Sequence, residues 1–258
     1  IYCSITGFGQ TGPYSKRGGV DQIAQGMGGL MSVTGHDRSE PVKVGVALVD
    51  VLAGLHALAG ILAALAHRRR TGEGQRVDTN LMSVLLSSMV NQASGFLGAG
   101  VVPSPLGNRH PSIVPYQTFD AADRPIAVAV GNDKQFRALC AVIGDPDLAE
   151  DRRYATNPAR VANRQLLCAA LQLHFARRTA ARWSVQLAEA GVPAGPVNDV
   201  AAAFALADEL GLRPAVEVEG SPVPQVANPI ALSRTPVQYR SPPPLLGSAD
   251  ERIDREDP

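Results

Sequence analysis

Residues 44–66 form a long apolar stretch that contains one acidic residue, Asp50. Apart from His56, every other residue of the stretch is aliphatic or glycine. A carboxylate in such surroundings loses water, and it stays ionised only where hydrogen bonds or positive charge compensate. Asp50 therefore has two candidate roles. One is the cap or first-turn acid of a helix, which the residues alone favour, and the other is a nucleophile or base held at the helix start.

The same stretch has the length of a membrane-spanning helix, and three arginines follow it at 68–70. Asp50, His56 and the glycines within it instead favour a buried helix of a large core, and we expect no membrane partner. The pattern predicts a helix from about residue 49 to residue 67. The arginines complement its negative end, and the Thr-Gly-Glu-Gly run at 71–74 ends it.

The composition is that of an ordinary globular protein with balanced charge. Of 258 residues, 45% are hydrophobic, and 24 Lys and Arg balance 24 Asp and Glu. This balance gives no electrostatic reason to expect nucleic acid as a partner. Three widely separated cysteines, Cys3, Cys140 and Cys168, indicate free thiols in a reducing, cytoplasmic compartment. No group of residues has metal-ligand spacing, so we predict no metal site.

Residues 7–12, Gly-Phe-Gly-Gln-Thr-Gly, match the GxGxxG pattern of dinucleotide-binding proteins and follow a predicted strand at 1–5. The next residues, 13–19, do not open an amphipathic helix, and no strand ending in an acid comes at the required distance. We therefore interpret the motif as a tight loop that lets the backbone approach a ligand, or as a simple turn.

The predicted elements divide the chain into domains. We predict part of a large domain over residues 1–97, a Gly- and Pro-rich linker over 98–115, a small α/β domain over 116–207, and a segment over 208–258 that returns to the large domain. Further predicted strands lie at 75–78, 215–219, 223–227 and 230–233, with a short strand or extended run at 40–47 and a hairpin at 116–130. Helices are predicted at 21–31, 133–143, 160–175, 180–190 and 199–207, with another of about fifteen residues capped by Asn80. The charged residues 248–258 are expected to fray.

Two further segments carry residues suited to a ligand. Lys16 and Arg17 precede two glycines, which suits a phosphate or pyrophosphate, although solvated loop charges are the default interpretation. Asp21 could pair with these cations or act in the site. His110 lies in a rigid turn at 107–111 that could cover a pocket, but a lone loop histidine is more often structural than chemical.

A series of short motifs runs along nearly the whole chain. They are Ser-Ile-Thr-Gly-Phe-Gly at 4–9, Gln-Gly-Met-Gly-Gly at 25–29, Val-Thr-Gly at 33–35, Leu-Val-Asp-Val-Leu-Ala-Gly at 48–54, Thr-Gly-Glu-Gly-Gln-Arg-Val at 71–77, Gly-Asn-Arg-His-Pro at 107–111, Gly-Asn-Asp at 131–133, Gly-Val-Pro-Ala-Gly-Pro-Val at 191–197 and Pro-Pro-Pro-Leu-Leu-Gly at 242–247. With these motifs in this order, the chain resembles the class III coenzyme A transferases, the relatives of formyl-CoA transferase, carnitine CoA-transferase and α-methylacyl-CoA racemase.

The resemblance implies an α/β fold with a Rossmann-like large domain and a smaller α/β domain, in two subunits interlocked as a homodimer. It implies acyl-CoA and a small carboxylic acid as substrates, and no permanently bound cofactor. The family's nucleophile aligns with Asp50. In such enzymes this carboxylate attacks the acyl-CoA thioester to form an acyl-aspartyl anhydride, CoA thiolate converts the anhydride to an aspartyl-CoA thioester, and the acceptor acid displaces CoA through a second anhydride.

The same resemblance assigns residues that contact CoA. It implies that Arg17, Gly18, Gly19, Val20 and Asp21 line the pantetheine and phosphates, that Leu81 lies near the adenine, and that Gly107, Asn108 and His110 belong to the loop region covering the site.

Two departures from the family matter. The racemases carry a general-base histidine immediately before the acid that aligns with Asp21, and here that place is Val20, which favours transfer over racemisation. An acyl-CoA racemase or isomerase of the same fold is the alternative enzyme, and a catalytically silent CoA- or partner-binding fragment is the alternative outside enzymes.

The chain also opens inside a predicted strand without Met, so we expect that the N-terminal part of a longer protein precedes Ile1.

Overall fold

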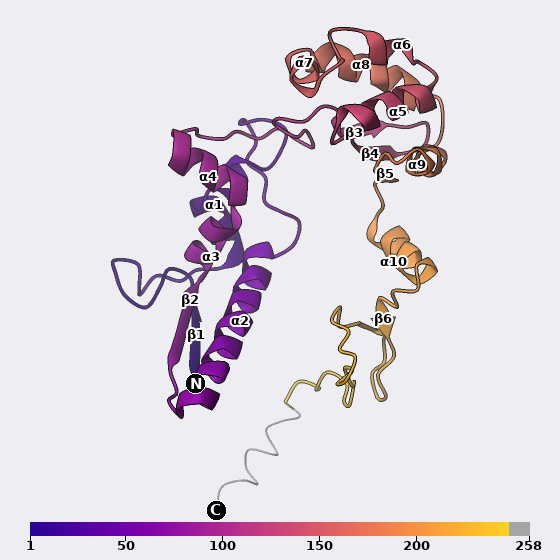
Figure 1. Ribbon diagram of the computed structural model, residues 1–258. Coiled ribbons are helices and arrows are strands. Elements are labelled where there is room, and N and C mark those ends of the chain that lie inside the picture. The colour runs from indigo at the N-terminus through magenta and orange to yellow at the C-terminus, as the bar shows by residue number, and fades with distance from the viewer. Residues whose placement is uncertain (248–258) are drawn as a thin grey trace, which may run out of the picture. The chain divides into compact units, whose positions relative to one another are not determined.

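The computed structural model describes residues 1–247 and has a mixed α/β architecture (Figure 1). The chain divides into two compact units, one covering residues 1–195 and the other beginning at Pro196. The predicted domain boundaries near residues 97, 115 and 207 stay predictions. Residues 248–258, which were expected to fray, lie outside the described part of the chain.

The first half of the first unit is built on two parallel strands and the helices that cover them. Its elements are β1 (Tyr2–Thr6), α1 (Asp21–Met27), the 3-10 helix η1 (Leu30–Ser32), α2 (Leu48–Thr71), β2 (Arg76–Asn80), α3 (Leu81–Ser88) and α4 (Val90–Ala99). β1 pairs with β2 from Tyr2 opposite Arg76 to Thr6 opposite Asn80, and α2 packs against both strands. Because the strands are parallel, both carboxyl ends lie at the same edge of the pair.

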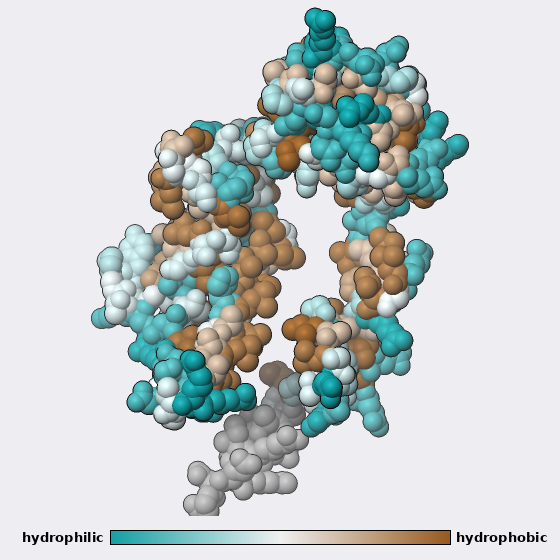
Figure 2. Space-filling view, in the orientation of Figure 1, coloured by the Kyte–Doolittle hydropathy of each residue, from teal (hydrophilic) through white to brown (hydrophobic). Residues whose placement is uncertain are grey.

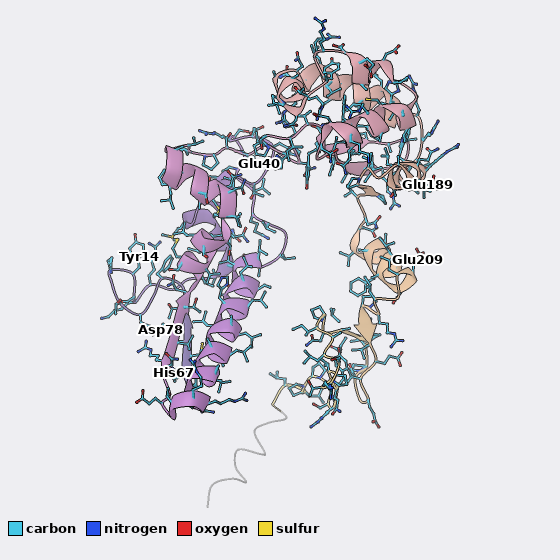
Figure 3. All side chains as sticks on the ribbon, viewed as in Figure 1. Tyr14, Glu40, His67, Asp78, Glu189 and Glu209 are labelled. Atoms are coloured by element: carbon cyan, nitrogen blue, oxygen red, sulfur yellow. The ribbon has the colours of Figure 1, made fainter. Side chains whose placement is uncertain are left out.

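α2 confirms the predicted helix and extends it to 24 residues. Gly72 ends it in the left-handed conformation at φ 81°, and its amide caps the carbonyl of Arg68. His67 lies near this end of α2, and Asp78 lies on the neighbouring strand β2 (Figure 3). Gly72 and the arginine run both lie at the end of the helix itself, so the local sequence is enough to predict where α2 ends.

The prediction of a buried core helix holds for one face of α2 only, in the part of the chain that the structure describes. The side chains that are buried belong to Val49, Ala53, Ala57 and Ala64, whereas the exposed ones include Val51, Leu55, Leu58 and Leu62. Small side chains on one stripe let α2 approach the strands closely, and the larger aliphatic residues face outward, where Figure 2 shows hydrophobic surface along this helix. By length and composition alone, α2 is the one helix among the described residues that could cross a membrane.

The predicted fifteen-residue helix after Asn80 occurs as two helices. The Asn80 side chain accepts a hydrogen bond of 2.8 Å from the amide of Ser83 and so caps α3, as expected. The chain then breaks at Val90, whose φ of 43° is outside the helical region, and α4 begins there. A β-branched residue rarely adopts positive φ, so no local signal predicts this break.

The second half of the first unit surrounds its own apolar cluster. Its elements are β3 (Tyr116–Asp120), β4 (Pro125–Ala129), α5 (Asp133–Ile143), α6 (Asp147–Glu150), α7 (Asn157–Ala162), α8 (Arg164–Phe175), α9 (Ala180–Glu189) and β5 (Ala194–Pro196). The hairpin, α5 and α9 confirm predictions, whereas α6 and β5 were missed, and the predicted helix at 160–175 is interrupted at Asn163.

Aromatic packing and one buried arginine organise this cluster. Phe175 stacks on Phe119 at 4.8 Å between ring centroids and accepts a hydrogen bond of 2.8 Å from the indole of Trp183 at its carbonyl. Arg160 is fully buried, donates to two backbone carbonyls, and forms an ion pair of 2.8 Å with Asp133. A buried guanidinium needs such complete pairing, so Arg160 serves the fold.

The cysteines of the chain are free thiols. Burial raises the pKa of the Cys140 thiol to about 12, with the charge of Asp145 adding to the effect. Burial also raises the pKa of Cys168. Both thiols therefore stay protonated at neutral pH and are poor nucleophiles.

The described part of the second unit contains little regular structure. It contains α10 (Val200–Glu209), capped by the Asp199 side chain, and the antiparallel pair β6 (Ala215–Val216) and β7 (Gln225–Val226). The predicted strand at 230–233 is wrong, and residues 40–47 also contain no strand. Pro41 lies within the segment 40–47 and lacks the amide that a strand ladder requires, and Pro229 directly precedes Ile230.

Two glycines of α2 give a matched test of this packing. A methyl group at Gly60 would lie 2.7 Å from the Cγ1 atom of Val77, whereas one at Gly54 would meet no atom within 4 Å outside its own turn of helix. We expect Gly60→Ala to lower the free energy of unfolding by about 1–3 kcal/mol because the helix and strand must separate.

Gly54→Ala should instead raise that free energy by about 1 kcal/mol, since alanine favours the helix. Urea denaturation followed by circular dichroism measures both values. Equal effects of the two substitutions would contradict the close contact between α2 and β2.

Candidate functional site

The residues singled out by sequence gather mainly at the carboxyl ends of β1 and β2. The loop after β1 covers residues 7–20, and α3 begins directly after β2. The carbonyl of Gly7 accepts a hydrogen bond of 3.2 Å from the amide of Met82 in the first turn of α3. Ligands of α/β proteins commonly bind at this edge, where loops and helix starts present backbone groups.

The glycines of the GxGxxG motif serve the loop itself. Methyl groups on Gly7 and Gly19 would each lie 2.6 Å from the Cα of the other glycine, so the two backbone segments cross in direct contact. Gly9 and Gly12 have φ values of 96° and 87°, which favour glycine. The interpretation as a tight loop therefore holds, and the close approach is between two parts of this chain.

Asp21 is the buried acid of the site. It is 9% exposed and is the first residue of α1. One carboxylate oxygen accepts a hydrogen bond of 2.8 Å from the amide of Val49 in the first turn of α2, and the other accepts one of 2.7 Å from the side chain of Gln25. The carboxylate therefore lies at the starts of two helices, where their dipoles favour negative charge.

Asp50 lies in the first turn of α2, next to the residue that Asp21 binds. It is the third residue of the helix, after Ala47 as N-cap, so the prediction of a first-turn acid is confirmed and that of an N-cap is wrong. Its side chain is exposed, which contradicts the expectation of a desolvated carboxylate. The apolar neighbours in sequence point along other faces of the helix. Among residues 1–247, no hydrogen bond or ion pair engages its carboxylate.

Arg17 belongs to a small aromatic group on the loop before α1. Its guanidinium lies 4.9 Å from the ring centroid of Tyr14 and 5.9 Å from that of Phe8, and the two rings pack edge to face. Tyr14 marks the position of this loop in Figure 3. Within the described residues Arg17 forms no salt bridge, so its donors are available to an anion. Val20 is 61% exposed at the start of α1.

Leu81 lies beside this group of residues but faces inward. Its side chain is 6% exposed and packs in the apolar cluster that also contains Ala24, Val49 and Leu85. The side chain therefore supports the helix starts. A contact of this position with adenine stays a prediction.

The contacts of the loop region 107–110 lie away from the residues at the carboxyl ends of β1 and β2. Gly107 has φ of 60°, donates a hydrogen bond of 2.8 Å to the carbonyl of Gly35, and leaves no room for a side chain beside His36. Asn108 donates to Thr118 at 3.0 Å and lines a cavity of about 390 Å³ over the β3–β4–β5 sheet.

His110 is held by its own turn. Its ring packs 5.2 Å from that of Tyr116, and its Nδ1 accepts a hydrogen bond of 3.2 Å from the amide of Ser112. Among the described residues, no hydrogen bond or ion pair joins residues 107–110 to Arg17, Asp21 or Asp50. Their role in covering a site stays a prediction.

Sequence reasoning missed Gln25, which is fully buried next to Asp21. Its spacing of four residues from Asp21 on a helix was a usable signal, since such residues are neighbours on one face. Its second partner, the amide of Val44, lies 19 residues away, and nothing in the sequence indicates that contact. The residues 1–247 also contain no cluster of His, Cys, Asp and Glu that could hold a metal ion.

A parallel strand pair whose carboxyl edge gathers a glycine loop, helix starts and a free carboxylate is the arrangement at which α/β proteins commonly bind ligands. The model of CoA-transferase family III matches residues 1–250. The chain therefore belongs to CoA-transferase family III, as its motifs suggested.

Known proteins agree with this assignment. The chain is 42% identical to the succinate–glutarate CoA-transferase of Agrobacterium fabrum over 98% of its own length and 64% of that protein. It is 38% identical to the acetyl-CoA:oxalate CoA-transferase of Acetobacter aceti, over 90% of the chain and 60% of that protein. A CAIB/BAIF family protein from Brucella suis, solved by crystallography, has a TM-score of 0.87 at 42% identity and aligns with 99% of this chain and 67% of its own. The chain thus spans about two thirds of the length of these relatives.

The crossing of Gly7 and Gly19 provides a test of the loop geometry. We expect Gly19→Ala to lower the free energy of unfolding by about 1–3 kcal/mol, because the new methyl group meets the backbone of Gly7. Gly18→Ala is the matched control, since a methyl group there meets no atom within 4 Å. Thermal unfolding of the two variants measures the difference, and similar melting temperatures would show that the segments do not cross in contact.

Proposed function

We propose that the protein is a CoA-transferase that moves CoA from an acyl-CoA donor to a carboxylic acid acceptor, with Asp50 as the nucleophile. The observation that carries this proposal is the state of the Asp50 carboxylate. It is exposed in the first turn of α2, it has no partner among residues 1–247, and the adjacent residue is anchored by Asp21. A nucleophile requires an accessible, unpaired oxygen on a fixed backbone.

The proposed reaction exchanges one thioester for another through covalent intermediates. An oxygen of Asp50 attacks the thioester carbon of the donor, the carbon–sulfur bond breaks, and CoA leaves as the thiolate. The thiolate then attacks the aspartyl carbon of the mixed anhydride, which releases the donor acid and leaves a thioester on Asp50. The acceptor carboxylate repeats the two steps in reverse order, forming acceptor-CoA and the free Asp50 carboxylate.

The open surface beside Asp50 supports the approach of a thioester. Gly54 follows four residues later and so lies next to Asp50 on the helix surface, and it carries no side chain that could lean over the carboxylate. The amides of Leu48 and Val49 in this turn already donate to Val46 and Asp21. The positive dipole end of the helix is therefore what favours the oxyanion that forms when the thioester is attacked.

We propose that CoA binds along the loop before α1. Arg17 offers free donors for a phosphate, and Gly18 leaves the backbone open to pantetheine, while Gly19, packed on Gly7, is a proposed contact that shapes the loop. Val20 and Asp21 complete this surface, with the exposed Val20 side chain available to the ligand. Leu81 and the loop residues Gly107, Asn108 and His110 are proposed contacts of the adenine end and of the covering region.

We further propose a dicarboxylic acid as acceptor. The relatives named above are a succinate–glutarate and an oxalate CoA-transferase, and both names contain short dicarboxylates. By the family's pattern, the protein acts as an interlocked homodimer with a Rossmann-like large domain. The three free thiols support a reducing, cytoplasmic compartment.

Replacement of the nucleophile tests the mechanism in the full-length protein. With succinyl-CoA and glutarate as the probe pair, we expect Asp50→Asn to lower kcat by at least about 10⁴-fold, because the amide oxygen cannot form the anhydride. The affinity for CoA, measured by calorimetry, should stay within about threefold, since the substitution keeps size and shape. Near-normal transfer by Asp50→Asn would show that the proposed nucleophile is wrong.

A trapping experiment identifies the covalent intermediate directly. Hydroxylamine added with succinyl-CoA should convert Asp50 to a hydroxamate, which mass spectrometry of the peptide can locate. Incorporation of solvent deuterium at the α-carbon of a branched acyl-CoA, without CoA transfer, would instead support the racemase alternative. Absence of both reactions with intact CoA binding would support a silent binding protein.

A further inference from the structure

Gln25 connects α1 to the segment that leads into α2. Its side-chain amide donates to Asp21 at 2.7 Å, and its side-chain oxygen accepts a hydrogen bond of 2.9 Å from the backbone amide of Val44. Asp21 in turn accepts from the amide of Val49 at 2.8 Å. Residues 44–49, which lead into the first turn of α2, are therefore held at both ends by adjacent side chains of one short helix.

The chemistry of this position restricts the residue that can fill it. The side chain must donate to a carboxylate and at the same time accept from a backbone amide, and a carboxamide of this length does both. A glutamate cannot donate when ionised, and a lysine cannot accept. Gln25 is also 0% exposed, so any unpaired group that its loss creates stays away from water.

The helix that carries Gln25, α1, is closely packed. α1 packs closely on α3, because Gly28, just beyond the end of α1, leaves room for the Leu85 side chain where a Cβ would overlap it. Leu85 and Val49 belong to one buried cluster, so α1, α3 and the start of α2 form a single packed group. The position of the first turn of α2 is therefore set by this packing together with the hydrogen bonds through Gln25 and Asp21.

We propose that Gln25 is a positioning residue for the reaction, which holds the first turn of α2 so that the Asp50 carboxylate meets the thioester carbon of the bound acyl-CoA. This inference rests on the proposed function of Asp50. Gln25 contacts neither substrate nor reacting atoms and acts through Val44, Asp21 and Val49. Because attack depends on near-ångström placement, a small shift of the turn reduces the chemical step more than it reduces binding.

The chain offers a matched control for the loss of two hydrogen bonds. Gln172 of α8 likewise uses both ends of its carboxamide, accepting from the amide of Asp120 at 3.0 Å and donating to its carbonyl at 2.8 Å. This bridge joins α8 to β3 in the other apolar cluster. Gln172→Met therefore removes the same number of side-chain hydrogen bonds as Gln25→Met, at a partly exposed position and without touching the helix that carries Asp50.

The test compares the two variants in the full-length protein with succinyl-CoA and glutarate. We expect Gln25→Met to lower kcat by about 10²-fold while KM for succinyl-CoA changes by less than about threefold, the pattern of lost transition-state placement. The rate at which hydroxylamine traps Asp50 in a single turnover should fall by the same factor. Gln172→Met should keep kcat within about twofold and lower the melting temperature by less than Gln25→Met does, because the groups it leaves unpaired can reach water.

A second variant covers the case in which Gln25→Met does not fold. Gln25→Asn keeps the carboxamide but is one methylene shorter, so it cannot reach both Asp21 and the Val44 amide, and kcat should again fall while the fold is retained. The proposal is overturned if a folded Gln25 variant keeps kcat and the trapping rate within twofold. It is also overturned if Gln25→Met and Gln172→Met lose activity equally.

Failure of the inference differs from failure of the proposed function. If Asp50→Asn is inactive and the Gln25 variants are fully active, the positioning role of Gln25 is wrong and Asp50 remains the nucleophile. If Asp50→Asn keeps normal turnover, the proposed function is wrong, and with it the inference that depends on it.

Discussion

The hydrogen bond from the amide of Val49 to the carboxylate of Asp21 fixes how the two central helices meet. It joins the first residue of α1 to the first turn of α2 across 28 positions of the sequence. A buried carboxylate requires such donors to remain charged, and a helix start has amides that lack partners within the helix. The start of α2 therefore gives the Asp21 carboxylate a donor, and Asp21 gives the amide of Val49 an acceptor. Because Asp50 follows Val49 in the same turn, this bond also places Asp50 at the carboxyl edge of the β1–β2 pair.

The two acids have divided roles that the sequence alone does not reveal. Asp50 lies in an apolar stretch and Asp21 follows a loop with two cations and two glycines, yet Asp50 is exposed and Asp21 is buried. Neighbours in a helical sequence lie on all faces of the helix, so the composition of a stretch does not report the environment of one side chain. The burial of Asp21 results from its contact with a distant helix start, which no local pattern encodes.

The same distinction explains which predictions were confirmed. α5, α9 and the β3–β4 hairpin follow from local periodicity and turn residues, and the end of α2 follows from its glycine. The contacts that form the site are long-range, including the crossing of Gly7 and Gly19 and the bond between Gln25 and Val44. The candidate nucleophile was predicted from its family motif, whereas the side chain that holds its helix in place, Gln25, required the structure.

The exposure of Asp50 has a chemical consequence for the proposed mechanism. An acyl-aspartyl anhydride is hydrolysed readily, so water must leave the site before or as the anhydride forms. Within residues 1–247 no side chain covers this carboxylate, whereas the start of its helix is rigidly held. In the proposed mechanism the bound acyl-CoA itself therefore supplies much of the cover. This coupling would restrict the labile intermediate to the liganded enzyme, because the nucleophile is enclosed only when its thioester substrate is present.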